Sequence, residues 1–253
     1  MYKIETHLHT AEVSLCGRIR ARDMVNRYYE AGYSTLFITD HFQPNSIDSL
    51  GDIPWEEKTA VFLSGYYRAK AAGDELGVTV LPGAEFTFPD SPNHYLAYGI
   101  TKGFLDAYPE LHKYSAGEFV SLAHQNGIYV VQAHPYRDGK CCPTPEYADA
   151  FEVYNANPRH ADYNDQAEAC AKAHGLPGTA GSDAHRSEDV AGSGVLSPFP
   201  IRSAEDYVRL LTTGQVRLSR EDAELSGCSV MPTVGKPRRE FSNIFRRPLP
   251  VIC

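Results

Sequence analysis

The sequence lacks long apolar segments: none of its 253 residues falls in a run of about 18 apolar residues, so no membrane-spanning helix is expected. The N-terminal segment also lacks the apolar core of a signal peptide, which favours a cytoplasmic protein. Basic residues are fewer than acidic ones, since the chain contains 24 Lys and Arg but 32 Asp and Glu. Since non-specific nucleic-acid binding needs positive charge, nucleic acid is a less favoured partner, although it stays an alternative.

Several sequence motifs of enzymes are also missing. The 6 cysteines contain no Cys-x-x-Cys pair, which argues against a disulfide scaffold and a closed zinc–thiolate site. There is no Gly-x-Ser-x-Gly nucleophile elbow and no Gly-x-x-x-x-Gly-Lys-Ser/Thr phosphate-binding loop. The chain does contain 10 histidines, and this residue type is the commonest metal ligand and acid–base group.

Short apolar runs alternate with helical segments, a pattern typical of parallel strands covered by helices. Strands are expected at residues 2–6, 34–39, 78–81, 95–100, 128–133, 151–154 and 176–180, and one long helix at 55–76. Polar residues follow so many of these strands that an α/β barrel is favoured over a doubly wound sheet. We therefore expect one barrel domain over residues 1–218, followed by an irregular, basic and Pro-rich tail over 219–253.

Five expected strands lead directly into His, Asp or Glu. In His7-Leu8-His9, extended backbone points both imidazoles to the same side. Because the carboxyl ends of parallel barrel strands meet at one mouth, the side chains after the strands should converge there. Imidazole and carboxylate together suit zinc, manganese or iron, and there are more candidate ligands than one ion uses. Two or three divalent transition-metal ions are thus predicted, with Glu85 as the natural bridge. The converging residues are His7, His9, Asp40, His41, Glu85, His134, Asp183 and His185.

These motifs resemble, in the same order, those of the PHP (polymerase and histidinol phosphatase) family. The matching segments are His7-Leu8-His9, Thr39-Asp40-His41, Gly83-Ala84-Glu85, Ala133-His134-Pro135 and Gly181-Ser182-Asp183-Ala184-His185. The resemblance covers residues 1 to about 218 and implies a distorted seven-stranded (β/α)7 barrel that hydrolyses phosphate esters. It assigns metal binding to His7, His9, His41, Glu85, His134, Asp183 and His185.

Two departures from the family pattern bear on a third ion. Where many members have a further acid or histidine after His-x-His, this loop offers only Glu12, or Cys16 close to an aspartate position. Where some members have a histidine beyond the fourth strand, this chain has His94 upstream of it instead. Glu12 and His94 are therefore further candidate ligands, and His94 is open between a ligand, a substrate contact and a surface turn residue.

A metal-activated hydroxide is the expected nucleophile, because two ions lower the pKa of a bridging water and neutralise a phosphoryl group. Asp40 is open between holding His41, transferring a proton and capping a turn. Arg18 and Arg137 are the expected phosphate-binding groups, since both follow strands that end in predicted ligands. Asn155 is expected to contact polar groups of the substrate.

The favoured function is a metal-dependent phosphoesterase that acts on a small phosphorylated metabolite or nucleotide. The alternatives are a phosphodiesterase or exonuclease acting on nucleic-acid ends, a metal-dependent amidohydrolase, and a non-catalytic metal-binding module. The sequence leaves the oligomeric state, the leaving group and the identity of the metal undetermined.

Overall fold

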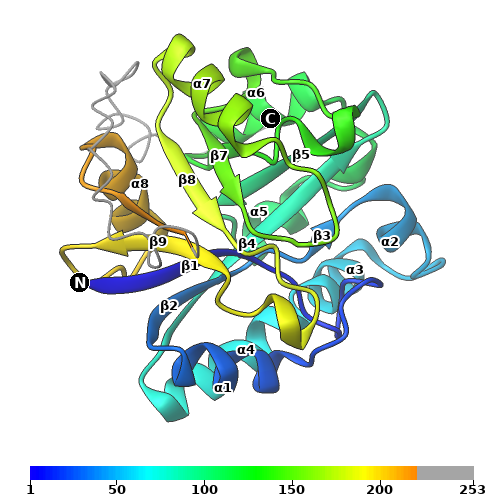
Figure 1. The fold of residues 1–253 in the computed structure, drawn as a ribbon. Helices are drawn as coiled ribbons and strands as arrows, with labels where there is room; N and C mark the ends of the chain where they lie inside the picture. The colour runs from blue at the N-terminus through cyan, green and yellow to red at the C-terminus, as the bar shows by residue number, and fades with distance from the viewer. Residues whose placement is uncertain (221–253) are drawn as a thin grey trace.

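The computed structural model describes residues 1–220, which form a strongly curved mixed sheet surrounded by helices (Figure 1). The strands are β1 (Tyr2–Leu8), β2 (Tyr33–Ile38), β3 (His41–Phe42), β4 (Thr79–Phe88), β5 (Ser91–Tyr98), β6 (Tyr129–Ala133), β7 (Ala150–Asn155), β8 (Gly178–Gly181), β9 (Ser193–Ser197) and β10 (Arg217–Arg220). The helices are α1 (Ala21–Glu30), α2 (Pro44–Asp48), α3 (Trp55–Phe62), α4 (Ser64–Leu76), α5 (Lys102–Ala107), α6 (Ala116–Gln125), α7 (Asn164–His174) and α8 (Ala204–Thr212), with short 3-10 turns at Leu111–Lys113, Arg137–Gly139, Pro145–Tyr147 and Ser187–Asp189.

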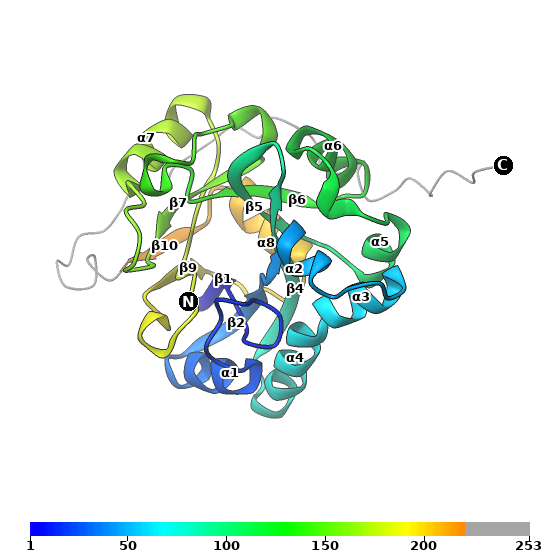
Figure 2. The ribbon, with the colours of Figure 1, turned by 90° about the vertical axis from the view of Figure 1, so that its right-hand side faces the viewer.

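The sheet runs in the order β10-β9-β1-β2-β4-β5-β6-β7-β8, and β3 pairs with β4 outside this path. The open path curls back on itself, because Leu8 forms a parallel bridge with Ala184 and Thr6 Oγ1 donates to the Ala180 carbonyl at 2.9 Å. Figure 2 shows the helices arranged around the strands, with α8 behind the centre of the ring. The expected α/β barrel is therefore confirmed.

The strand number and direction differ from the prediction of seven parallel strands. All seven expected strands are present, and residues 1–220 contain three more: β3 and the β9–β10 pair. Strand β5 runs antiparallel to both β4 and β6, and β9 runs antiparallel to β1. The short turn between β4 and β5 explains the first reversal, since antiparallel neighbours need only a tight connection.

The expected helix over residues 55–76 is two helices, α3 and α4, that meet at Leu63. Ser115 and Glu118 form a capping box at the start of α6. No helix among residues 1–220 is long and apolar enough to cross a membrane. Ser219 and Arg220, the first two residues of the predicted tail, belong to β10, and the rest of the tail, 221–253, lies outside the described residues.

One end of the barrel is filled by aromatic side chains. Tyr207 of α8 packs against Phe37 and Tyr98, with ring centroids 5.0 and 4.8 Å apart, and its hydroxyl lies 2.6 Å from Thr179 Oγ1. Tyr98 ends the reversed strand β5, where it pairs with Gly83 in the middle of β4 and with Tyr129 at the amino end of β6. This packing closes the amino end of the barrel and leaves the opposite end for polar groups.

Candidate metal centre

Eight side chains meet at the end of the barrel opposite Tyr207. They come from β1 and the residue after it, β3, β4, β5, and the residues that follow β6 and β8. Seven are the predicted ligands, and the eighth is His94. They form overlapping groups whose ligand atoms lie within 4.8 Å of one another: His9, His41 and His185; His7, His9 and Glu85; His7, His134 and Asp183; and His41, Glu85 and His94.

The reversal of β5 explains why His94 belongs to this cluster. His94 lies near the start of an antiparallel strand, where it pairs with Thr87 of β4 and with Ala133 of β6. Ala133 directly precedes His134, so the amino end of β5 reaches the same rim as the carboxyl ends of its neighbours. Because His94 Nδ1 lies 2.9 Å from Glu85 Oε1, His94 is not a surface turn residue. The roles of metal ligand and substrate contact remain open for it.

Glu85 lies at the centre of the cluster and is almost fully buried. Its Oε1 lies 2.9 Å from His94 Nδ1 and 3.1 Å from His134 Nε2, while its Oε2 lies 2.7 Å from His41 Nδ1. Because the two oxygens face different imidazoles, the carboxylate has the geometry of a group that bridges two cations.

Asp183 provides the second central carboxylate. Its Oδ1 lies 3.2 Å from His9 Nε2 and 3.5 Å from His7 Nε2, and its Oδ2 accepts from Arg137 Nη2 at 2.6 Å. Asp183 and His134 both have positive φ, +51° and +29°. Non-glycine residues rarely adopt this backbone conformation, and such strain is concentrated at functional sites.

Several polar atoms of the cluster lack a hydrogen-bond partner although they are fully buried. Among them are His7 Nε2, His9 Nε2 and Glu85 Oε2. Buried polar groups are nearly always paired, so each such atom needs an explanation. Buried lone-pair donors that converge without hydrogen-bond partners fit divalent cations, and the residues present therefore suit divalent metal in their chemistry.

A second layer of residues orients the ligand atoms. His7 Nδ1 lies 2.9 Å from Glu152 Oε1, which leaves Nε2 directed into the cluster. The other oxygen of Glu152 accepts from the His134 amide at 3.1 Å and from Asn155 Nδ2 at 2.9 Å. Such carboxylate–histidine pairs fix the tautomer and the ring orientation of metal ligands. The sequence analysis did not predict a role for Glu152. The signal that could have indicated one is its position as a charged residue within the apolar strand β7.

The local electrostatics favour a charged Glu85 and a neutral His9, whereas Glu152, Asp183 and Glu85 outweigh burial and raise the pKa of His7 well above its ordinary value. Burial raises the pKa of Glu85, but His94, His41 and His7 more than offset it, so the pKa lies well below its ordinary value. Burial and the neighbouring His41 and His185 hold the pKa of His9 well below its ordinary value. At neutral pH, His9 therefore keeps the lone pair that a metal ligand needs.

Asp40 lies behind the ligands and does not hold the His41 imidazole, which corrects one of its expected roles. Its carboxylate accepts from the Thr10 amide at 2.6 Å, from Thr10 Oγ1 at 2.7 Å and from Ser14 Oγ at 2.7 Å. Ser14 Oγ in turn lies 3.3 Å from His9 Nδ1 and accepts from the His41 amide at 3.1 Å. Burial raises the pKa of Asp40 to about 6. Asp40 therefore acts through Ser14 as a positioning residue.

A pocket of about 360 Å³ opens over the cluster. Its wall carries more positive than negative side chains. The lining residues that carry charge or titrate are Cys16, His41, His94, Arg137, Asp138, Lys140, Cys141, Arg159, His160, His185 and Arg186.

The pocket includes only some of the predicted substrate-binding residues. Arg137 lines the pocket, whereas Arg18 is exposed and does not line it. The main-chain amide of Arg18 donates a hydrogen bond to the His185 carbonyl. Asn155 is buried beneath the wall, where it donates to Glu152, whereas Asn157 lines the pocket. Glu12, an open ligand candidate, instead accepts from the Ala21 amide at the start of α1 at 2.9 Å.

Comparison with known proteins agrees with this geometry. Residues 161–216 match the family model described as PHP-associated. A search of the curated proteins gave no match. Among solved structures, a two-domain protein from Bacteroides vulgatus that contains a predicted PHP-like metal-dependent phosphoesterase superposes with a TM-score of 0.66 at 15% identity, over 87% of this chain and 64% of that chain. The chain has the PHP fold. The predicted resemblance to the PHP family is thereby confirmed.

Two further structures share the PHP fold of this chain. PsfC from Pseudomonas syringae has a TM-score of 0.63 at 20% identity, over 88% of this chain and 92% of that chain. An amidohydrolase from Chromobacterium violaceum, solved with bound sulfate and no metal, has a TM-score of 0.51 at 17% identity, over 88% and 99%. At these identities the similarity concerns the fold, and this chain spans less than two thirds of the Bacteroides protein.

Proposed function

We propose that this protein is a metal-dependent hydrolase that cleaves a phosphate ester of a small metabolite or nucleotide. The observation that carries the proposal is the buried set of eight converging ligand side chains, with Glu85 and Asp183 at its centre. The phosphoesterase described for the Bacteroides relative supports the same reaction class. Two or three divalent ions, zinc, manganese or iron, are the proposed cofactors.

Bound divalent ions would supply the acidity that activates water and the charge that neutralises a phosphoryl group. The protein's own residues set up this chemistry. Glu152 and Ser14 orient His7 and His9, respectively, so that their Nε2 atoms point inward. Arg137 fixes one oxygen of Asp183 and leaves the other toward His9. The enclosed position of these groups limits the water that would screen their charges.

The pocket wall favours a small anionic substrate. Arg137, Lys140, Arg159 and Arg186 line it, against the single carboxylate of Asp138. Arginine forks bind phosphate in two-point contacts, and a cationic wall lowers the energy of a phosphorylated ligand. A pocket of about 360 Å³ suits a small metabolite or nucleotide better than an open groove for nucleic acid.

The proposal is tested with chelated protein reloaded separately with manganese, zinc or iron. Metal content and turnover of p-nitrophenyl phosphate and bis-p-nitrophenyl phosphate are measured for the wild type, for Asp183→Asn and for the surface control Asp74→Asn. We expect monoester turnover with metal, a loss of at least about 100-fold in Asp183→Asn, and no change in the control. Diester turnover alone would favour a phosphodiesterase. Full metal loading without turnover of either ester, followed by cleavage of amide substrates, would overturn the phosphoesterase proposal.

A further inference from the structure

A second, smaller pocket adjoins the one over the metal centre, and nothing in the function proposed above uses it. It encloses about 280 Å³. Pro92 and His94 line both pockets, so the second begins where the first ends. We call it the Thr87 pocket, and its lining residues are Gln43, Pro44, Asn45, Thr87, Phe88, Ser91, Pro92 and His94.

The strands that carry the metal ligands continue into the wall of the Thr87 pocket. In the β3–β4 ladder, His41 pairs with Glu85, and Gln43 and Thr87 come two residues after these partners. The backbone of Gln43 is still extended, with φ −137° and ψ 157°. Because alternate residues of extended backbone point to the same side, Gln43 lies on the side of His41, and Thr87 on the side of Glu85. Thr87 also pairs with His94 across the β4–β5 ladder.

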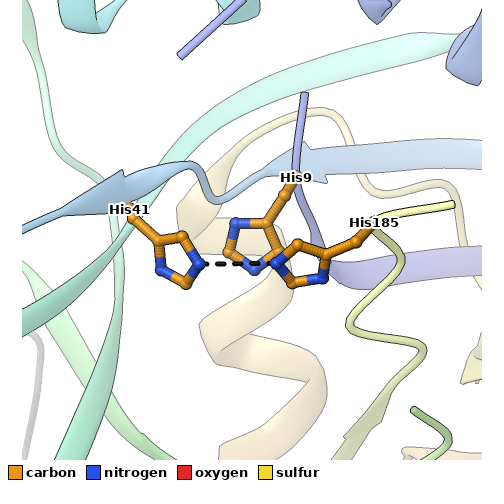
Figure 3. A group of neighbouring side chains, drawn as sticks. All are labelled: His9, His41 and His185. Atoms are coloured by element: carbon orange, nitrogen blue, oxygen red, sulfur yellow. Dashed lines mark hydrogen bonds between the residues drawn. The ribbon is translucent and has the colours of Figure 1, made fainter. Parts of the chain in front are cut away.

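Histidines of the metal centre lie at the boundary between the two pockets. His94 Nδ1 lies 2.9 Å from Glu85 Oε1, and the rings of His94 and His41 are in edge contact, with centroids 6.2 Å apart. On its other side, His41 Nε2 lies 3.4 Å from His185 Nε2 (Figure 3). A phosphoryl group held over this cluster would therefore lie at the inner mouth of the Thr87 pocket, and the alcohol part of its ester would extend into the pocket.

Both walls of the Thr87 pocket are held in place by contacts of the folded chain. In the turn between β4 and β5, the Asn93 amide donates to Ser91 Oγ at 3.1 Å, and Asn93 Oδ1 accepts from the Cys142 amide at 2.9 Å. On the other wall, Gln43 directly precedes α2, whose Ile47 is buried in the core. The shape of the pocket is thus set by the fold.

The polar side chains of the Thr87 pocket are neutral apart from the titratable His94. No Lys, Arg, Asp or Glu of residues 1–220 lines it, whereas arginines and a lysine line the pocket over the metal centre. Asp48 of α2 lies 3.0 Å from His112 Nε2, and Asp90 of the β4–β5 turn accepts from the Ala116 amide at 3.2 Å. A charged group that entered the Thr87 pocket would lose hydration without gaining a counter-ion, which is costly.

Hydroxyl and amide groups of this pocket have unused hydrogen-bonding capacity. Among residues 1–220, the Thr87 hydroxyl and the Asn45 side-chain amide have no hydrogen-bond partner. Gln43 Nε2 donates to Ser46 Oγ at 3.2 Å, and Ser91 Oγ accepts from a backbone amide at 3.1 Å, so within the same residues Gln43 Oε1 and the Ser91 hydrogen remain available. Hydroxyls and amides both donate and accept, which matches the hydroxyl groups of a ligand.

The apolar part of the lining suits a carbon skeleton better than a nucleobase. It consists of Pro44, Pro92 and Phe88. Phe88 is only 3% exposed, so it offers little of its ring for a base to stack on.

We propose that the Thr87 pocket binds the alcohol part of the phosphate ester, and that this part is uncharged and carries hydroxyl groups, as in a polyol or a sugar. The inference rests on the proposed phosphoesterase function and names its substrate class. The cationic pocket receives the phosphate, and the Thr87 pocket receives the hydroxyl groups. Thr87 and Asn45 are then residues that determine specificity.

The test compares glycerol 3-phosphate with 3-phosphoglycerate, which has a carboxylate in place of a hydroxymethyl group, in metal-reloaded full-length protein. We expect kcat/KM to be about 10-fold higher for glycerol 3-phosphate, because the Thr87 pocket has no cation for the carboxylate. Asn45→Lys supplies a cation at an exposed position and should shift this ratio toward 3-phosphoglycerate by about 5-fold or more.

Thr87→Val keeps the side-chain shape and removes the hydroxyl. It should lower kcat/KM about 3- to 10-fold more for glycerol 3-phosphate than for p-nitrophenyl phosphate, which has no hydroxyl group. Calorimetric titration of the chelated protein gives a readout without turnover, in which Thr87→Val should weaken binding of glycerol 3-phosphate relative to inorganic phosphate. Thr213→Val, at an exposed threonine after α8, is the matched control and should change neither ratio. Circular dichroism checks that each variant folds.

Several outcomes would overturn the inference. Equal effects of Thr87→Val on glycerol 3-phosphate and p-nitrophenyl phosphate, with phosphate esters still hydrolysed, would refute the subsite and leave the proposed function intact. A wild-type preference for 3-phosphoglycerate would refute the uncharged alcohol. A nucleoside monophosphate that is preferred over glycerol 3-phosphate, with a preference lost in Thr87→Val, would assign the pocket to a nucleoside instead. Absence of turnover of every ester, with binding of glycerol 3-phosphate that still depends on Thr87, would refute the proposed function and leave the subsite.

Discussion

Replacing Arg137 with alanine should destabilise the metal-free protein much more than the metal-loaded protein. The guanidinium lies 2.7 Å from Asp162 Oδ1 and 2.6 Å from Asp183 Oδ2. The arginine side chain is 12% exposed, and those of the two aspartates are 3% and 1% exposed. Without Arg137, two buried carboxylates lose their shared cation, and removing one partner of a buried ion pair costs about 3–5 kcal/mol.

We expect the lower end of this range, about 3 kcal/mol, because the guanidinium reaches the pocket wall and water enters there. Burial raises the pKa of Asp162 to about 6, against the opposing effect of Arg137, so this carboxyl also takes up a proton readily. In a folded region of this size, about 3 kcal/mol lowers Tm by about 6–12 °C. Divalent ions bound at Asp183 would replace the lost positive charge, so the loss should fall to less than half.

The assay is calorimetric unfolding near neutral pH, with chelator and with saturating manganese. Arg22→Ala is the control, because Arg22 pairs with Glu75 on the surface, where the side chains are 61% and 56% exposed. Exposed pairs contribute little, so no measurable change in Tm is expected for the control. A fall of less than about 2 °C in the metal-free protein, or an equal fall with and without metal, would show that Arg137 is not needed as the shared cation of Asp162 and Asp183.

Two further predictions concern the residues behind the cluster. Burial raises the pKa of Glu5 from 4.5 to about 7, so the folded state keeps a proton that the unfolded chain releases, and stability from this group falls as pH rises between those values. In urea unfolding, the stability of Glu5→Gln relative to the wild type should therefore rise by on the order of 3 kcal/mol across that window, and a pH-independent difference would contradict this. Gly65→Ala should weaken metal binding by about 10-fold or more, because its Cβ would overlap Thr10 Oγ1 and lie 2.5 Å from Asp40 Oδ2. Calorimetric metal titration of Gly65→Ala and of the open-site control Gly103→Ala checks this, and equal affinities would count against it.

The histidines and carboxylates at the strand ends were predictable because period-two geometry and parallel strands are local rules. His7 and His9 needed only an extended backbone, and Glu85 and Asp183 needed only their places after apolar runs. His94 was ambiguous, since its role depends on the direction of β5, which a short turn reversed. The expected positions of Arg18 and Glu12 differ from the observed ones for a related reason, because the hydrogen bonds of a loop determine where its side chains point. Here the Arg18 side chain lies outside the pocket, and the Glu12 side chain lies at the start of α1.

Sequence alone thus determined the fold class and seven of the eight residues that meet at the barrel mouth, because strand alternation and the chemistry of side chains after strands are encoded within short segments. The contacts that hold those residues in place depend on the tertiary structure. The pairing of His7 with Glu152 spans 145 residues, and Arg137 reaches Asp183 across 46. Contacts of this kind arise when distant segments pack together, and local pattern carries no information about which atoms then come within hydrogen-bonding distance.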